Sequence, residues 1–123
     1  MLLVVMGLAA VEMARPSAHH SATASYEANG SITITGKVLE FRWTNPHCHV
    51  YVDVAAGPFK GRTYTVELSS PGALVTEGWS KTMLRPGDDV SLKVHPSRTG
   101  APAGLCRRCT LTINGRLKRT SGN

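Results

Sequence analysis

The chain contains five stretches in which apolar and polar residues alternate, the pattern of strands that bury one face. In the second stretch, for example, Val50, Val52 and Val54 alternate with Tyr51 and Asp53. The pattern predicts strands over residues 31–43, 47–54, 63–68, 90–95 and 109–113.

The first predicted strand changes phase along its length. Its apolar positions shift from even to odd numbers, as shown by Ile32, Ile34, Val38, Leu39, Phe41 and Trp43. Gly36 lies beside this shift, so we predict a bulge or a sharp coil within one long strand. Elsewhere, Asn45-Pro46 predicts a turn, residues 96–104 predict a Pro- and Gly-rich loop, and Asn114-Gly115 predicts a hairpin.

A short helix is predicted between the third and fourth strands. Ser70 suits the N-cap, Pro71 the first helical position and Gly78 the position just past the end. The resulting order is β-β-β-α-β-β, the order of an OB-type barrel. We therefore predict an all-β fold with one short helix, an OB-like five-stranded barrel, with a small open sheet and one helix as the alternative topology.

Residues 1–18 have the features of a signal peptide. Their apolar run, residues 1–11, is too short to span a bilayer, and Ser17 and Ala18 are small residues suited to a cleavage end. A buried N-terminal helix is the alternative interpretation. We predict a signal peptide over 1–18, an arm over 19–30, the barrel over 31–118 and a tail over 119–123, in a periplasmic or secreted protein without a membrane span.

The 123 residues include 14 Lys and Arg against 8 Asp and Glu, a formal net charge of +6. A chain of this length is one domain, which excludes a multi-domain enzyme. Basic residues gather near the C-terminus, at Arg107, Arg108, Arg116, Lys118 and Arg119. This cluster suggests an anionic envelope partner, whereas nucleic acid is not expected for an exported protein.

Several short motifs follow one another in a fixed order: Ala18-His19-His20-Ser21, Trp43-Thr44-Asn45-Pro46-His47, Glu67 with Ser70-Pro71, Gly78-Trp79, Leu84 with Pro86-Gly87-Asp88, and Val94-His95-Pro96. Together they resemble a family of small secreted bacterial proteins of unknown function. The resemblance implies a signal peptide that ends just before the histidine pair and an OB-like barrel, and it implies no established activity. Gly72, Cys48 and the Cys106–Cys109 segment depart from the family pattern, so they take no role from it.

Histidines are the first candidate for chemistry. His47 and His49 are two residues apart on a predicted strand, so their side chains are expected on one face. Glu67 is expected on the outward face of the third strand, and His95 at the end of the outward face of the fourth. Imidazoles in this arrangement suit a transition metal. Isolated surface histidines that bind nothing are the alternative interpretation.

The predicted cleavage adds two further ligands. If it follows Ala18, His19 presents both its free α-amine and its ring to one ion, and His20 lies beside it. Copper(II) leads the divalent affinity order for nitrogen ligands, so copper is the first choice and zinc the second. The predicted metal ligands are thus His47, His95, His19, His20, Glu67 and His49.

The three cysteines allow several interpretations. Cys106 and Cys109 form a C-x-x-C segment, but residues three apart on a straight strand face opposite ways, so a direct bridge needs a turn or bulge. Cys48 and Cys109 are both expected on core faces. A structural disulfide using two of the three, free buried thiols, and a redox or metal role all remain open.

No motif for a nucleophilic serine, a phosphate loop or a zinc protease occurs in the chain. We therefore expect a non-catalytic, exported binding module that captures a metal ion on the polar face of the second to fourth strands. An interaction module for an acidic or anionic partner, and a thiol-redox protein using Cys106 and Cys109, are the alternatives.

Overall fold

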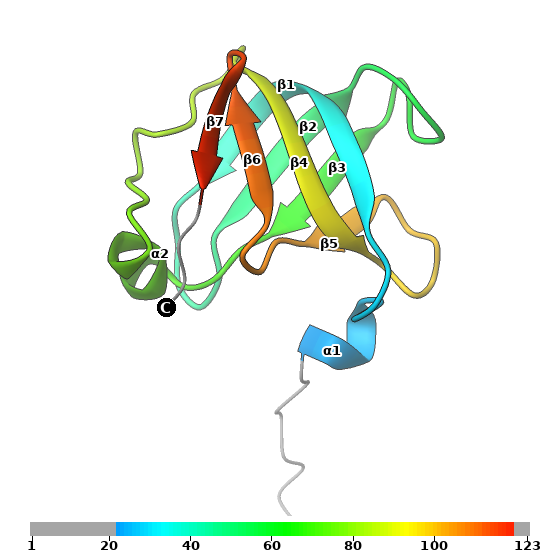
Figure 1. Ribbon diagram of the computed structural model, residues 1–123, viewed down its shortest axis with the longest axis horizontal. Coiled ribbons are helices and arrows are strands. Elements are labelled where there is room, and N and C mark those ends of the chain that lie inside the picture. Colours follow the sequence, from blue (N-terminus) through cyan, green and yellow to red (C-terminus); the bar gives the residue numbers. More distant parts are fainter. Residues whose placement is uncertain (1–21, 120–123) are drawn as a thin grey trace, which may run out of the picture.

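The structure is a computed structural model that describes residues 22–119 (Figure 1). It confirms the predicted fold class: a mostly β protein built around a closed, OB-like five-stranded barrel. The strands are β1 (Ile32–Arg42), β2 (His49–Val54), β3 (Thr63–Glu67), β4 (Asp89–Pro96), β5 (Ala103–Leu105), β6 (Thr110–Ile113) and β7 (Arg116–Arg119), and the helices are α1 (Ala22–Ser25) and α2 (Pro71–Thr76).

The barrel closes because β1 pairs with a different strand at each end. Its first half is antiparallel to β4, and its second half is antiparallel to β2. The order then continues from β2 through β3 and β5 back to β4, with β3 and β5 parallel. Along this closed path, the five barrel strands have no unpaired edge. Closure therefore protects the backbone groups that the edges of an open sheet would expose.

β5 and β6 together form the fifth strand of the barrel. Along β4, His95 pairs with Leu105 and Leu92 pairs with Leu111. Leu92 and His95 are three residues apart in β4, whereas their partners Leu111 and Leu105 are six residues apart. The segment that joins β5 to β6 therefore contains three extra residues. This bulge holds the C-x-x-C segment, and β7 continues beyond it as a hairpin partner of β6.

Gly36 is the point at which both neighbours of β1 meet. It is the register partner of Val54 in β2 and of Val90 in β4. A Cβ at this position would collide with the backbone carbonyl of Asp53. Glycine therefore permits the close approach of β2 that closes the barrel.

The bulge in β1 lies slightly later than the sequence pattern indicates. The register shifts between Val38 and Glu40, and the residue between them, Leu39, is 48% exposed. Leu39 was expected on the inner face, and that expectation is wrong because the bulged residue turns outward. Phe41 and Trp43 do return to the core side and pack against it.

The core consists of the inward side chains of the strands together with residues from α2 and the segment that follows it. Tyr64, Leu92 and Leu111 are fully buried, and Leu74 of α2 and Trp79 cover the barrel. The predicted helix is confirmed, since the Ser70 side chain accepts a hydrogen bond from the Ala73 backbone N–H. No helix among residues 22–119 is long and apolar enough to cross a membrane.

Two stretches differ from the predicted elements. Ala103 and Gly104, expected in the loop over 96–104, form β5 together with Leu105, because their backbone completes the barrel between β3 and β4. A strand of three residues is too short to show an alternating pattern. The strand predicted over 47–54 begins at His49, so His47 lies not on the strand but in the turn that follows the cis Asn45–Pro46 peptide.

Replacing Gly36 with alanine tests the closing contact. Because the added methyl group meets backbone rather than a flexible side chain, we expect Gly36→Ala to lower the free energy of unfolding by about 1–3 kcal/mol. Urea denaturation followed by circular dichroism measures this. Gly72→Ala is the matched control, since its site in α2 is open, and it should leave stability unchanged or raise it slightly. Equal stability of the two variants would contradict the assigned role of Gly36.

Candidate ligand-binding site

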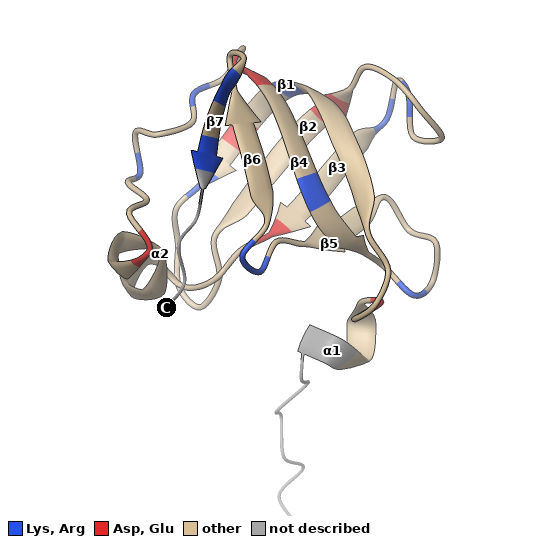
Figure 2. Ribbon diagram, in the orientation of Figure 1, with Lys and Arg blue, Asp and Glu red and all other residues tan. Residues whose placement is uncertain are grey.

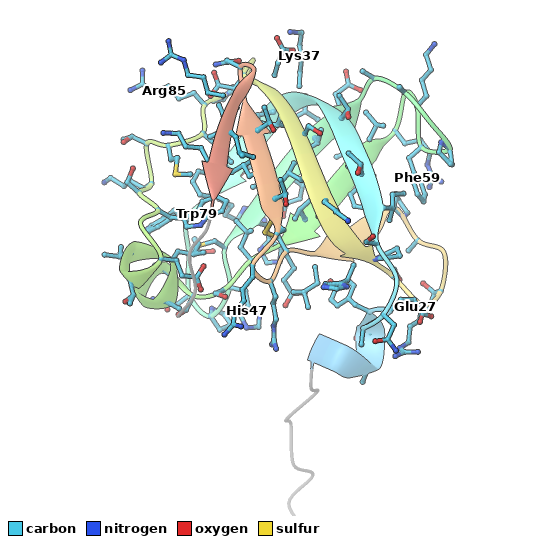
Figure 3. The ribbon with its side chains drawn as sticks, viewed as in Figure 1. Glu27, Lys37, His47, Phe59, Trp79 and Arg85 are labelled. Atoms are coloured by element: carbon cyan, nitrogen blue, oxygen red, sulfur yellow. A yellow bond between two sulfur atoms is a disulfide. The ribbon has the colours of Figure 1, made fainter. Side chains whose placement is uncertain are left out.

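One end of the barrel collects most of the predicted site residues. The turn before β2, the last residue of β3, the C-terminal part of β4 and the arm that precedes β1 all meet there. Figure 3 shows His47 and Glu27 at this end, which is the end next to α1. The arm is anchored to β4, since Glu27 N–H donates to the Pro96 carbonyl and Arg98 N–H donates to the Ser25 carbonyl.

Glu67 is the central group of this end. One carboxylate oxygen, Oε1, lies 2.9 Å from Nδ1 of His47, and the other, Oε2, accepts a hydrogen bond of 2.7 Å from the Tyr26 hydroxyl. The Glu67 side chain is only 20% exposed, whereas that of His47 is 48% exposed. A single carboxylate therefore ties together the turn, the end of β3 and the arm.

The environment of Tyr26 keeps its hydroxyl protonated. Partial burial raises the pKa of Tyr26 well above its usual value, and the hydrogen bond to Glu67 raises it further. A phenolate would lose the hydrogen bond and face the carboxylate as a second negative charge. Tyr26 consequently acts as a fixed donor to Glu67.

The contact with Glu67 also determines which nitrogen of His47 is available. A carboxylate accepts hydrogen bonds, so Nδ1 carries the proton that points to Glu67. In the neutral ring, Nε2 then has a free lone pair and lies on the exposed side chain. A histidine whose Nδ1–H is held by a carboxylate is the arrangement found behind many metal-bound imidazoles.

A small cavity of about 160 Å³ opens beside this pair. Its polar lining comes from His47, Glu67, Ser69, Ser70 and Arg107, and its apolar lining comes from Pro46, Leu68, Ala73 and Leu105. The volume is sufficient for an ion with its water shell or for a small anionic group. Among the lining residues, Arg107 is the only one whose side chain carries a permanent positive charge.

His95 has a structural role at the same end. Its Nδ1 lies 2.8 Å from the Gly30 carbonyl and 3.2 Å from the Glu27 carbonyl. Carbonyl oxygens only accept, so Nδ1 carries the proton and pins the arm to β4. His95 also lines a second cavity of about 260 Å³ together with Lys93, Arg107 and Arg108.

The structure does not bring the predicted ligands together as a set. His49 is the register partner of Glu67, but its ring packs near Tyr51, with a centroid separation of 6.3 Å, and His47 is not on its strand. The expectation that His47 and His49 share a strand face is therefore wrong. Within residues 22–119, no three His, Cys, Asp or Glu side chains are placed to hold one metal ion. His19 and His20 lie outside the described residues.

The cysteines are now assigned. Cys106 and Cys109 form a disulfide across the bulge between β5 and β6, which supplies the turn that a bridge between residues three apart requires. Cys48 is a buried free thiol whose pKa is raised by that burial. The bulge could not be located from the sequence, because β5 itself carries no periodic signal.

Tyr26 and Arg107 are site residues that the sequence analysis did not assign to the site. Tyr26 lies in a short polar arm with no apolar period, and only the fold shows that the arm crosses beneath β3. Arg107 was counted with the basic C-terminal cluster, but the bulge turns it toward the His47 cavity. A lone aromatic residue in a polar arm is the one signal in the sequence that points to Tyr26.

Removing the Tyr26 hydroxyl tests whether Glu67 holds the arm. We expect Tyr26→Phe to cost about 1–2 kcal/mol of stability, because a hydrogen bond to a charged acceptor is lost. Amide hydrogen exchange should accelerate at Glu27 and Arg98, which join the arm to β4, and stay slow at Val66 in the core. Tyr51→Phe is the control, since Tyr51 packs under Arg42 instead. An unchanged arm in Tyr26→Phe would contradict this assignment.

Thiol labelling tests the cysteine assignment. Without reductant, iodoacetamide should leave the folded protein unlabelled, because Cys48 is buried and the other two are bonded. Unfolding in urea should expose one reactive thiol, and unfolding with reductant should expose all three. Mass spectrometry of tryptic peptides identifies the labelled residues. Labelling of Cys106 or Cys109 without reductant would show that the bridge is absent.

Comparison with known proteins gives one result. A search of curated proteins and a search of solved structures each returned no match. A protein-family model matches residues 7–107, which include His47, Glu67, His95 and the whole barrel up to the bulge. The β6–β7 hairpin lies beyond the matched residues. The match covers most of the chain, so this protein belongs to the family of unknown function DUF6152.

Proposed function

We propose that this chain is an exported, non-catalytic binding module that captures a transition metal, copper in the first place and zinc in the second. The proposed ligands are Nε2 of His47 and the two histidines of the arm, His19 and His20. The observation that carries this proposal is the Glu67 carboxylate, which fixes His47 on one oxygen and anchors the arm on the other.

The position of the arm supports a role for its two histidines as metal ligands. Tyr26 is fixed against Glu67, and His20 precedes it by six residues. Six residues span at most about 20 Å, so the arm histidines are tethered within reach of His47. Cleavage after Ala18 would give His19 a free α-amine, which forms a chelate with its own ring nitrogen.

Glu67 has a supporting role in this proposal. Its carboxylate orients the His47 ring and makes the imidazole a stronger donor to an ion, as carboxylates behind metal-bound histidines do. Both oxygens already have protein partners, so Glu67 acts as an acceptor and not as a ligand. His95 holds the arm in place, and His49 takes no part.

Copper binding by the secreted protein tests the proposal. Isothermal titration calorimetry of the mature chain should show one site with micromolar or tighter affinity for Cu²⁺ and weaker binding of Zn²⁺. His47→Ala should weaken copper binding at least tenfold, because the oriented imidazole is lost. Glu67→Gln should weaken it about tenfold or more, because the ring is no longer held by a carboxylate. His49→Ala is the matched control and should bind like the wild type.

Two outcomes would overturn the proposal. Absence of binding by the wild type would exclude the metal function altogether. Equal affinity of His47→Ala and the wild type would show that the arm binds copper alone, as many terminal histidine sequences do, and that the barrel contributes no ligand. Nitrogen hyperfine lines in the electron paramagnetic resonance spectrum, lost in part in His47→Ala, provide a second readout that does not depend on affinity.

A further inference from the structure

Strand β7 is the open edge of the sheet. It is the last strand in the sheet order, and among the described residues it pairs only with β6. The turn between them is two residues long, with positive φ at Asn114 (48°) and Gly115 (78°), so it is a type I′ hairpin. The outer side of β7 therefore presents backbone groups that have no strand partner within residues 22–119.

The hairpin geometry indicates which backbone groups face outward. In a two-residue hairpin, the residues that flank the turn exchange both backbone hydrogen bonds, so the Ile113–Arg116 and Leu111–Lys118 pairs point their N–H and C=O groups at each other. The residue between, Leu117, then directs its N–H and C=O to the free edge. Leu117 is also 53% exposed, an unusually open position for a large apolar residue.

The side chains of β7 carry positive charge on the inner face of the hairpin. Arg116 is opposite Ile113 and Lys118 is opposite Leu111, both of which are buried in the core. The two basic residues thus lie on the core-facing side of a strand that extends past the core. Figure 2 shows Lys and Arg, in blue, at both ends of β7.

A groove lies on the core-facing side of β7. It has a volume of about 630 Å³, and Arg116, Lys118 and Ile113 line one side. Residues of the segment after α2 line the other side, including Met83 and Ser80. The groove thus combines two positive charges with a mixed polar and apolar lining, beside an open strand edge.

The hairpin is held in place at its turn. The Asn114 side chain accepts a hydrogen bond from the Asp89 N–H and donates one to Asp88, and the Asn114 N–H donates to the Asp89 carbonyl. The bond from the Asn114 side chain lowers the pKa of Asp88, whose carboxylate also accepts from the Arg85 N–H. An edge that is fixed before binding loses less conformational entropy when a strand is added to it.

We propose that the outer edge of β7 is a docking site for an extended, acidic peptide segment of another protein, which adds to the sheet as one more strand. Its backbone would pair with Leu117, and acidic side chains at alternate positions would enter the groove beside Arg116 and Lys118. This interaction is separate from metal capture, because it uses neither His47 nor Glu67.

The positive charge of β7 determines which kind of chain can pair with its edge. A second copy of this chain, added edge to edge, would place Arg116 and Lys118 against the same residues of the other molecule, and like charges across neighbouring strands repel. A chain with alternating carboxylates meets the same edge with opposite charge. The matching chemistry is therefore an acidic strand-forming segment and not a symmetric dimer.

A synthetic peptide in which glutamate alternates with threonine is the probe. Titrated into ¹⁵N-labelled full-length protein at low salt, it should shift the amide signals of β7 and slow hydrogen exchange at Leu117. A peptide with lysine in place of glutamate should not bind. The double variant Arg116→Gln/Lys118→Gln should bind about tenfold more weakly, and added salt should weaken wild-type binding in the same direction.

Substitution of Leu117 separates strand addition from simple charge attraction. Leu117→Pro removes the outward N–H without removing a β6–β7 hydrogen bond, so it should weaken binding about fivefold or more. Leu117→Ala keeps the N–H and should bind like the wild type. If Leu117→Pro disturbs the hairpin, slowed hydrogen exchange at Leu117 in the wild-type complex is the remaining test of whether the peptide joins the sheet as a strand.

The opposite results would overturn the proposal. Equal binding by Leu117→Pro with an intact hairpin, or no added protection at Leu117, would show that the peptide does not join the sheet. Equal binding of anionic vesicles by Leu117→Pro, with no binding of the peptide, would assign the basic residues to a membrane surface instead. A dimer that light scattering detects in the absence of peptide would show that a second copy occupies the edge.

Discussion

The close approach of two backbones at Gly36 is the constraint on which this structure depends. There β1 pairs with β2 on one side and with β4 on the other, and a Cβ would collide with the Asp53 carbonyl. Without this approach β1 could serve only one neighbour, and the sheet would remain open. Closure in turn brings the N-terminal arm, which leads into β1, across the end of β3 and β4.

The Glu67 contacts are a consequence of that closure. β1 and the arm begin next to β4, whereas Glu67 ends β3 on the far side of β5. Only a closed barrel places Tyr26 from the arm and His47 from the β1–β2 turn on the two oxygens of one carboxylate. The site is thus made of residues that are distant in the sequence and are joined by topology. Its partial burial strengthens each of these contacts relative to a fully exposed pair.

The sequence predicts the parts of this structure that local chemistry determines. The alternating pattern located all five predicted strands, now β1, β2, β3, β4 and β6, and the Ser70-Pro71 pair and the Asn114-Gly115 turn act through local geometry. Glu67 was predicted on the outward face of its strand, as found. The sequence could not predict β5, because three residues are too few to show an alternating pattern. It could not predict the arm contact of Tyr26 either, because its partner Glu67 is 41 residues away in the chain. The same holds for the outward turn of Leu39, which follows from a register shift that pairing alone determines.

The bulge between β5 and β6 connects the two surfaces that the proposals concern. One barrel strand is divided there: β5 pairs with β3 and leads to Arg107 at the His47 cavity, whereas β6 leads to the open edge at β7. The Cys106–Cys109 disulfide spans the division and fixes how the two halves follow one another. Because the metal proposal depends on residues before the bulge and the peptide proposal on residues after it, variants of one surface leave the other intact. Each proposal can therefore fail without the other.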